Sequence, residues 1–123
     1  MRLLALGALV LAVLVPGANG QPTFTDVTAE AGVSYQQWTT LPQNNEAMRM
    51  TGGAAAGDLN GDGFPDLLVT RIDAPDLLFL NNGQGGFVDG SAAAGFTANL
   101  QTNGVALGDI DNDGDLDAYL TSV

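Results

Sequence analysis

Two acidic stretches, "GDLNGDGFPD" at 57–66 and "GDIDNDGDLD" at 108–117, decide how this sequence is interpreted. They hold eight of its fourteen acidic residues. Each follows a run of small or apolar residues and precedes a short apolar segment. Carboxylates crowded in this way repel one another unless a counter-charge lies among them. The pattern therefore predicts a bound cation in each stretch.

The acidic stretches belong to a longer internal repeat. Residues 51–70 align with residues 102–121 at an offset of 51, with nine of twenty positions identical. Upstream, "FTDVTAEAG" at 24–32 aligns with "FVDGSAAAG" at 87–95 at an offset of 63. The two offsets differ because the first unit holds an insertion near 33–50. We expect unit one to cover about 24–86 and unit two about 87–123.

The segments between the turn signals are short and strand-like, rich in Leu, Val, Ile and Phe. The predicted strands are "AAAGD", "LLVTRI", "DLLFL", "FVDGS", "VALGD" and "AYLTS". The Asn and Gly residues of "NNGQGG" (81–86) suit a hairpin turn. "TAEAG" and "SAAAG" favour single helical turns. The predicted fold class is all-β, with about four antiparallel strands per unit.

A unit of this size with four strands is typical of one β-propeller blade. A solenoid of stacked β-units is the alternative. About one and a half blades do not close a ring that takes four to eight. We therefore expect an N-terminal fragment of a longer protein, with further blades in the same chain. A self-contained two-unit domain would leave an apolar strand edge exposed.

The spacing inside the acidic stretches is that of an oxygen-ligand loop. The residues at positions 1, 3, 5 and 9 can converge on one ion where the chain wraps around it, and a glycine at position 6 permits the bend. Position 7 would contribute its backbone carbonyl. The apolar residues between these positions can pack inward. In order, the predicted ligands are Asp58, Asn60, Asp62, Phe64 and Asp66 in the first loop, and Asp109, Asp111, Asp113, Asp115 and Asp117 in the second.

Donor sets made only of oxygen favour Ca²⁺ over zinc or copper, and the number of carboxylates disfavours Mg²⁺. The sequence therefore predicts two structural Ca²⁺ sites. An acidic, solvated turn is the alternative, because Asp, Asn and Gly also populate ordinary turns. An EF-hand does not fit, since position 12 is Val69 or Leu120 instead of Glu and a strand follows the loop instead of a helix.

The loops, the "LLFLNNGQGGF" hairpin and "FTDVTAEAG" together resemble FG-GAP/VCBS repeats, the calcium-binding blades of integrin-α-type propellers. The motif F-x-D-V-T-x-x-A-G is most similar to the cartilage acidic protein-like, ASPIC/UnbV-associated group of secreted proteins. The resemblance covers about residues 24–123. It implies a seven-bladed propeller with Ca²⁺ between the first two strands of a blade, held by the ten residues named above.

Composition excludes several function classes. The net charge of −11 argues against nucleic acid and anionic membrane as partners. The absence of Cys and His removes disulfides, thiolate zinc sites and the usual nucleophile–base pairs. We therefore expect no enzymatic activity in this region.

The first twenty residues read as a cleaved secretory signal peptide. One Arg precedes an apolar run from Leu3 to Val15, and Ala18-Asn19-Gly20 has the small residues of a cleavage site. An uncleaved anchor is the alternative, but a membrane span takes about 20 apolar residues. The expected mature chain, 21–123, is secreted, extracellular or periplasmic, and does not insert in the membrane.

These features predict a secreted, calcium-rigidified propeller scaffold for binding protein or glycan, as in cell adhesion. Tyr35, Trp38 and Arg49 in the insertion are residue types favoured at binding surfaces, and core packing is their alternative role. The competing function is the propeller region of a larger secreted enzyme, for example a polysaccharide-active one, with its catalytic residues beyond Val123.

Overall fold

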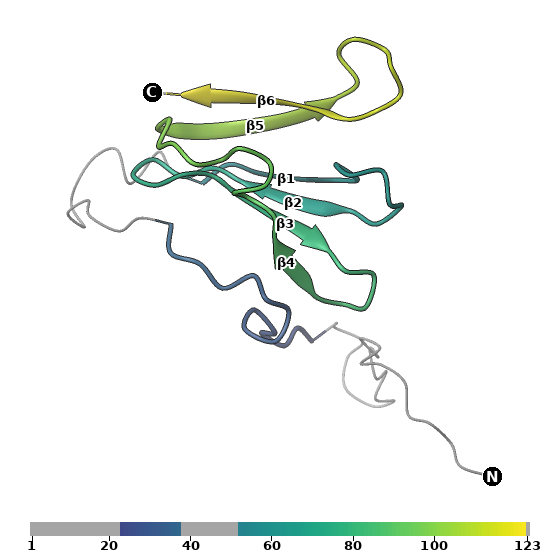
Figure 1. The fold of residues 1–123 in the computed structure, drawn as a ribbon. Coiled ribbons are helices and arrows are strands. Elements are labelled where there is room, and N and C mark those ends of the chain that lie inside the picture. Colours follow the sequence, from purple (N-terminus) through teal and green to yellow (C-terminus); the bar gives the residue numbers. More distant parts are fainter. Residues whose placement is uncertain (1–22, 38–51, 123) are drawn as a thin grey trace.

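The computed structural model describes residues 23–37 and 52–122, and its regular elements are six β-strands in two antiparallel sheets (Figure 1). In chain order the strands are β1 (Ala54–Gly57), β2 (Asp66–Val69), β3 (Leu77–Asn81), β4 (Phe87–Asp89), β5 (Thr102–Gly108) and β6 (Asp117–Ser122). The described residues contain no helix. The all-β prediction is confirmed for this part of the chain.

The first sheet is a four-stranded meander in the order β1-β2-β3-β4, as expected for a propeller blade. Ala55 pairs with Leu68, and Leu68 pairs with Leu78 on the next strand. The predicted hairpin at 81–86 joins β3 to β4, closed by a hydrogen bond from Asn82 N–H to the Gly86 carbonyl at 2.9 Å. Asn82 also accepts hydrogen bonds from two turn amides through its side chain. Asn at this position thus stabilises the turn that the sequence predicts.

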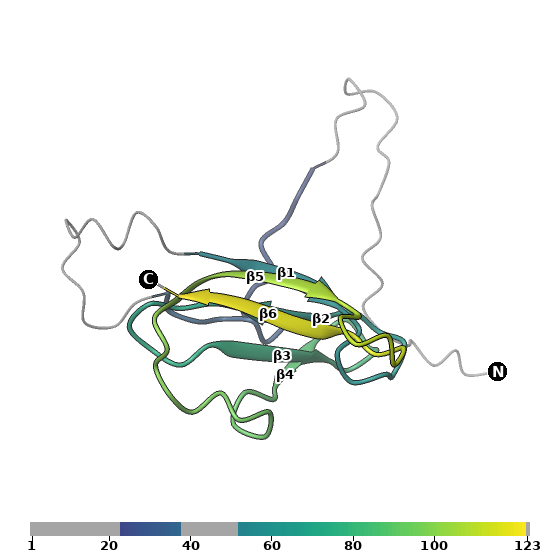
Figure 2. The same cartoon turned by 90° about the horizontal axis from the view of Figure 1, so that it is seen from above.

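β5 and β6 form the second sheet, and the register shifts between Thr102 and Gly104. Seen from above, β5 lies over β1, and β6 lies toward β2 (Figure 2). The backbones approach closely at Gly53, where a Cβ atom would lie 2.8 Å from Gly104 Cα. A larger residue at Gly53 would push the two sheets apart.

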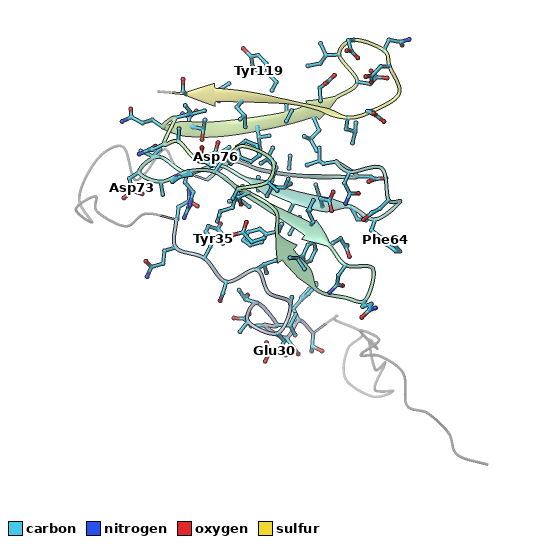
Figure 3. The ribbon with its side chains drawn as sticks, viewed as in Figure 1. Glu30, Tyr35, Phe64, Asp73, Asp76 and Tyr119 are labelled. Carbon is cyan, nitrogen blue, oxygen red and sulfur yellow. The ribbon has the colours of Figure 1, made fainter. Side chains whose placement is uncertain are left out.

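The apolar core lies on β2 and β3 and on the loop between them. Its buried side chains are Leu68, Val69, Ile72, Ala74, Leu78 and Phe79. Tyr35, in the predicted insertion, packs its ring against Phe79 with centroids 6.1 Å apart, as in the alternative role of core packing (Figure 3). Gln37 anchors the same segment by donating from its amide nitrogen to the Thr70 carbonyl at 2.8 Å.

A buried carboxylate joins the two sheets. Asp76 is 3% exposed and accepts hydrogen bonds from Arg71 N–H at 2.8 Å and from the Thr102 hydroxyl at the start of β5. Thr102 is itself buried. Because a buried carboxylate needs its hydrogen-bond donors, this contact fixes the start of β5 against the β2–β3 loop.

The sequence repeat and the sheets have different boundaries. β4 lies at the start of the predicted second unit, yet it is the outer strand of the first sheet. Residues 28–32 and 91–95 form single turns closed by backbone hydrogen bonds, as their sequences predict.

The predicted signal peptide (1–20) and most of the insertion, including Trp38 and Arg49, lie outside the described residues. Within the described ranges, no helix has the length and apolar character needed to cross a membrane.

Candidate metal centre

The two acidic loops occupy equivalent places. One connects β1 to β2 and the other connects β5 to β6, and both lie at the same end of the molecule as the β3–β4 hairpin (Figures 1 and 2). The strands on either side of each loop are paired up to Gly57–Asp66 and Gly108–Asp117. Each loop is therefore held at both ends by a hydrogen-bonded strand pair.

The first carboxylate of each loop organises the backbone around itself. Asp58 accepts hydrogen bonds from the amides of Gly61, Asp62 and Gly63 at 2.8 to 3.1 Å.

Asp109 accepts the equivalent bonds from Asp113 and Gly114, both at 3.1 Å. In each loop the chain consequently wraps around the residue at position 1, as a ligand loop requires.

Two positions in each loop adopt the left-handed conformation. Gly63 and Gly114 at position 6 have φ of 87° and 98°, which confirms the predicted bend. Position 4 also has positive φ, at Gly61 (75°) and Asn112 (62°). The sequence reasoning missed this second bend, although Gly and Asn are the residue types that favour it.

The position-9 carboxylates lie at the base of the loops, each tied to its own loop backbone. Asp66 is fully buried; its Oδ2 accepts from Leu59 N–H at 3.0 Å and its Oδ1 accepts from Asn81 N–H at 2.8 Å. Asp117 is half-buried and its Oδ2 accepts from Ile110 N–H at 2.8 Å. Asp66 thus links its loop to β3 as well as closing the loop.

The second loop brings three carboxylates together. Oxygen atoms of Asp109, Asp111 and Asp117 all lie within 4.8 Å of one another. Among the described residues, no other group of three acidic side chains meets this spacing. A hard cation is the ligand that such an all-oxygen set fits best.

The remaining predicted ligands lie around these groups. Asp113 accepts from Asp115 N–H at 3.0 Å, and in the first loop Asp62 accepts from Phe64 N–H at 2.9 Å. The amide nitrogen of Asn60 donates to Asp62 at 2.9 Å. In the first loop, therefore, the side chains at positions 3 and 5 are hydrogen-bonded to each other. The backbone carbonyls of Phe64 and Asp115 remain predicted ligands.

The apolar residues of the loops are mostly exposed, contrary to the prediction of inward packing. Ile110 is 69% exposed and Leu116 is 39% exposed, and Pro65 is also exposed. Only Leu59 is half-buried. The loops project beyond the sheets, so their side chains have few neighbours there.

Phe64 points toward the β3–β4 hairpin (Figure 3), and a Cβ atom on Gly83 would lie 2.9 Å from its ring. The first loop is thereby packed against the hairpin turn.

The hydroxyl of Ser91 is hydrogen-bonded within the fold. Ser91 is buried, its hydroxyl accepts from Leu78 N–H at 2.9 Å, and it donates to Asp89. Both bonds stabilise the end of β4.

The sequence of this chain is similar to those of known proteins. A family model described as an FG-GAP-like repeat matches residues 58–120, from the first ligand position of the first loop into β6. Human cartilage acidic protein 1 is 36% identical over 103 residues, which cover 81% of this chain and 14% of the relative. The mouse protein of the same name is 36% identical over 101 residues, with the same two shares. The chain spans about 14% of the length of these curated relatives.

Proposed function

Because this chain belongs to the FG-GAP-like repeat family, we propose that it is a calcium-binding β-propeller repeat module of an exported protein. Its role is that of a non-catalytic scaffold, in which bound Ca²⁺ fixes the loops at one end of the blades. The observation that carries the proposal is the convergence of Asp109, Asp111 and Asp117.

The donors of the second loop suit Ca²⁺ in kind and number. Three side-chain carboxylates converge, and a fourth, Asp113, belongs to the same loop. The carbonyl of Asp115 stands at the position that provides a backbone ligand in loops of this spacing. The first loop would use Asp58, Asn60, Asp62, Asp66 and the carbonyl of Phe64 once its internal side-chain hydrogen bond opens.

Calcium would stabilise the fold through these loops. Without a cation, repulsion among the carboxylates opposes the closed loop, and a divalent ion offsets that repulsion. Because each loop joins two paired strands, binding energy becomes folding energy. The ion is structural in this proposal, since its ligands come from the protein and no open position is needed for a substrate.

Export is the second part of the proposal, and the sequence pattern of residues 1–20 supports it. Outside the cell, Ca²⁺ modules with dissociation constants of about 10⁻⁴ to 10⁻³ M are useful, because calcium is abundant there. A rigid, acidic scaffold of this kind would present its loops to an extracellular protein or glycan.

The test is a calcium titration of protein purified from the medium or periplasm of expressing cells. We expect a chain that begins at Gln21 by mass spectrometry, binds Ca²⁺ in calorimetry and melts at a higher temperature with Ca²⁺ than with chelator. Glu30→Gln changes the charge by the same amount as Asp→Asn but lies outside the loops. It should leave the Ca²⁺ affinity and the rise in melting temperature with Ca²⁺ unchanged. A chain that binds no Ca²⁺ in calorimetry and melts at the same temperature with Ca²⁺ and with chelator would contradict the proposal.

A further inference from the structure

Three Asn–Gly pairs lie in the described residues, at 60–61, 82–83 and 103–104. In such a pair the backbone nitrogen of glycine can attack the side-chain amide carbon of asparagine, because glycine has no side chain to hinder the attack. Hydrolysis of the succinimide ring that forms replaces the asparagine by aspartate or isoaspartate. The attack needs a free glycine N–H and a mobile asparagine side chain, so the fold decides which pair reacts.

The pair at 103–104 is held in the second sheet. Gly104 pairs with Thr121 on β6, and the Thr121 hydroxyl donates to the side-chain oxygen of Asn103 at 2.9 Å. A Cβ atom on Gly104 would lie 2.6 Å from that hydroxyl oxygen, so the neighbouring strand lies directly against the pair. Both residues of the pair are half-buried. Succinimide formation here would require the β5–β6 pairing to open.

The pair at 82–83 is held in the β3–β4 hairpin turn. The side-chain oxygen of Asn82 accepts from two turn amides at 2.8 and 3.1 Å. Gly83 N–H, which would be the attacking group, donates to the side-chain oxygen of Asn81 at 2.9 Å. The Phe64 ring lies against Gly83. None of these groups is charged, so no repulsion among them opens the turn.

The pair at 60–61 lies in the first acidic loop and is exposed. The side-chain oxygen of Asn60 accepts from Asp62 N–H at 3.0 Å, so this side chain is folded back along the Gly61 peptide. Its amide nitrogen, which leaves on deamidation, donates to the Asp62 carboxylate. Gly61 N–H donates to Asp58 Oδ1 at 2.8 Å. No described atom beyond the chain neighbours lies within 4 Å of a Cβ position on Gly61.

Charge decides when this loop opens. Without a cation, the carboxylates of Asp58 and Asp62 repel each other, and this repulsion favours opening. In the closed loop, Asp58 keeps the proton on the Gly61 nitrogen, because a carboxylate disfavours a second negative charge beside it. Opening frees both reacting groups, whereas a cation bound by the loop would hold the Asn60 oxygen in place. The ion-free first loop is therefore the reactive state.

We propose that Asn60 is a site of spontaneous deamidation, reactive when the first loop holds no calcium and protected when it does. Hydroxide takes the Gly61 amide proton, and the nitrogen forms a bond to Asn60 Cγ. The Cγ–Nδ2 bond breaks, and Nδ2 leaves as ammonia with a proton from water. One further water opens the succinimide at either carbonyl. Protection by calcium rests on the proposed function, whereas the selection of Asn60 among the three pairs rests on the fold.

The two products should have opposite effects on calcium binding. Asn60 corresponds to Asp111 at the offset of 51, and Asp111 is one of the three carboxylates that converge in the second loop. The aspartate product gives the first loop the side-chain ligands of the second, so its affinity for Ca²⁺ should rise. The isoaspartate product adds a methylene to the backbone between positions 3 and 4. It breaks the alternate spacing of the ligands and should abolish binding.

The test incubates the purified full chain at neutral pH with Ca²⁺ or with chelator and follows each pair by mass spectrometry of its peptides. In chelator, Asn60 should convert fastest, then Asn82, and Asn103 slowest. At free Ca²⁺ about ten times the dissociation constant from calorimetry, conversion of Asn60 should slow about tenfold, because only the ion-free loop reacts. Equal conversion of all three pairs in chelator overturns the proposal, since the fold would then not select Asn60.

Three variants provide matched controls. Gly61→Asn installs the residue that the second loop has at this place, Asn112, whose φ of 62° shows that the bend is kept. Its side chain hinders the attack and should remove the preference for Asn60. Asp58→Asn should abolish the protection of Asn60 by Ca²⁺, while Asp109→Asn, the equivalent change in the second loop, should preserve it. Protection lost equally in both would contradict a local effect of the first loop.

Calorimetry separates failure of this inference from failure of the proposed function. If the chain binds no Ca²⁺, the proposed function fails, and the conversion in chelator still tests the selection of Asn60. If the chain binds Ca²⁺ but Asn60 converts equally with Ca²⁺ and with chelator, this inference is overturned while the proposed function stands. Asn60→Asp, combined with Asp109→Asn so that the first site is measured alone, should bind Ca²⁺ more tightly than Asp109→Asn. An equal or weaker site contradicts the effect expected of the aspartate product.

Discussion

At the scale of single residues, buried polar side chains at the turns, such as Ser91, stabilise the fold through hydrogen bonds. Ser91 both accepts from Leu78 N–H and donates to Asp89, and it is 6% exposed. A buried N–H that loses its acceptor costs about 1 to 3 kcal/mol. We therefore expect Ser91→Ala to lower the free energy of unfolding by about that amount in urea denaturation. Ser122→Ala, at an exposed serine on β6, should change it by less than about 0.5 kcal/mol.

Asp26 and Asp89, which accept hydrogen bonds at the start of the two turns, predict that the free energy of unfolding depends on pH. Hydrogen bonds from the Ser91 hydroxyl and backbone hold the pKa of Asp89 below its usual 3.8, and Thr28 lowers the pKa of Asp26 in the same way. A carboxyl whose pKa is lower in the folded state stabilises the fold above its unfolded pKa. That stabilisation is lost as the pH falls through the folded pKa.

The difference in unfolding free energy between wild type and Asp89→Asn should therefore be constant from neutral pH to about the usual pKa of 3.8, and then vanish below it. It should be small, under about 1 kcal/mol, because Asp89 is exposed. Urea denaturation of both proteins at a series of pH values and fixed calcium measures it. A difference that grows at low pH would contradict the assigned direction.

At the scale of elements, the two acidic loops share a backbone but differ in ligands. The second loop brings three carboxylates within 4.8 Å, whereas in the first an amide–carboxylate hydrogen bond joins positions 3 and 5. Affinity for Ca²⁺ grows with the charge of the ligand set. The second loop should therefore bind more tightly.

Single substitutions at equivalent positions test this ranking. Asp109→Asn should remove the tighter site and Asp58→Asn the weaker one in calcium calorimetry. Each residue also organises its loop backbone, so Asn, which keeps one acceptor oxygen, is the suitable change. A remaining site that is stronger in Asp109→Asn than in Asp58→Asn would reverse the order.

At the scale of the whole molecule, a buried hydrogen bond between Thr102 and Asp76 joins the second sheet to the first. Asp76 accepts from Arg71 N–H and from the Thr102 hydroxyl, and both Asp76 and Thr102 are buried. Thr102→Val removes one donor to a buried carboxylate while keeping the side-chain shape. We expect a loss of about 1 to 3 kcal/mol.

Amide hydrogen exchange can show which strands lose stability in Thr102→Val. Amides of β5 and β6 should exchange faster in Thr102→Val, while those of β2 and β3 keep most of their protection. Thr121→Val is the matched control, because the Thr121 hydroxyl donates to Asn103 at an exposed site. Uniform loss of protection across both sheets would show that Thr102 does not act at the contact between the two sheets.

Local sequence was sufficient for the strands and turns. Asn82 and its neighbouring glycines predicted the β3–β4 hairpin, and the glycines at position 6 predicted the bends at Gly63 and Gly114, because positive φ is a property of single residues. The four-stranded meander likewise followed from short apolar segments separated by turn residues.

What the sequence by itself determined is therefore the all-β class, the repeat, the hairpin and the spacing of the oxygen donors, since each depends on residues close together in the chain. Only the tertiary structure decided that Asp66 is buried against β3 while Asp117 is not, and that Asp76 meets Thr102. The bonds from Asn81 to Asp66 and from Thr102 to Asp76 join residues 15 and 26 positions apart, and their partners are set by packing and burial rather than by local preference. Two loops with nearly the same sequence pattern consequently end in different surroundings: the first is covered by a hairpin and the second has the equivalent edge of β6 exposed.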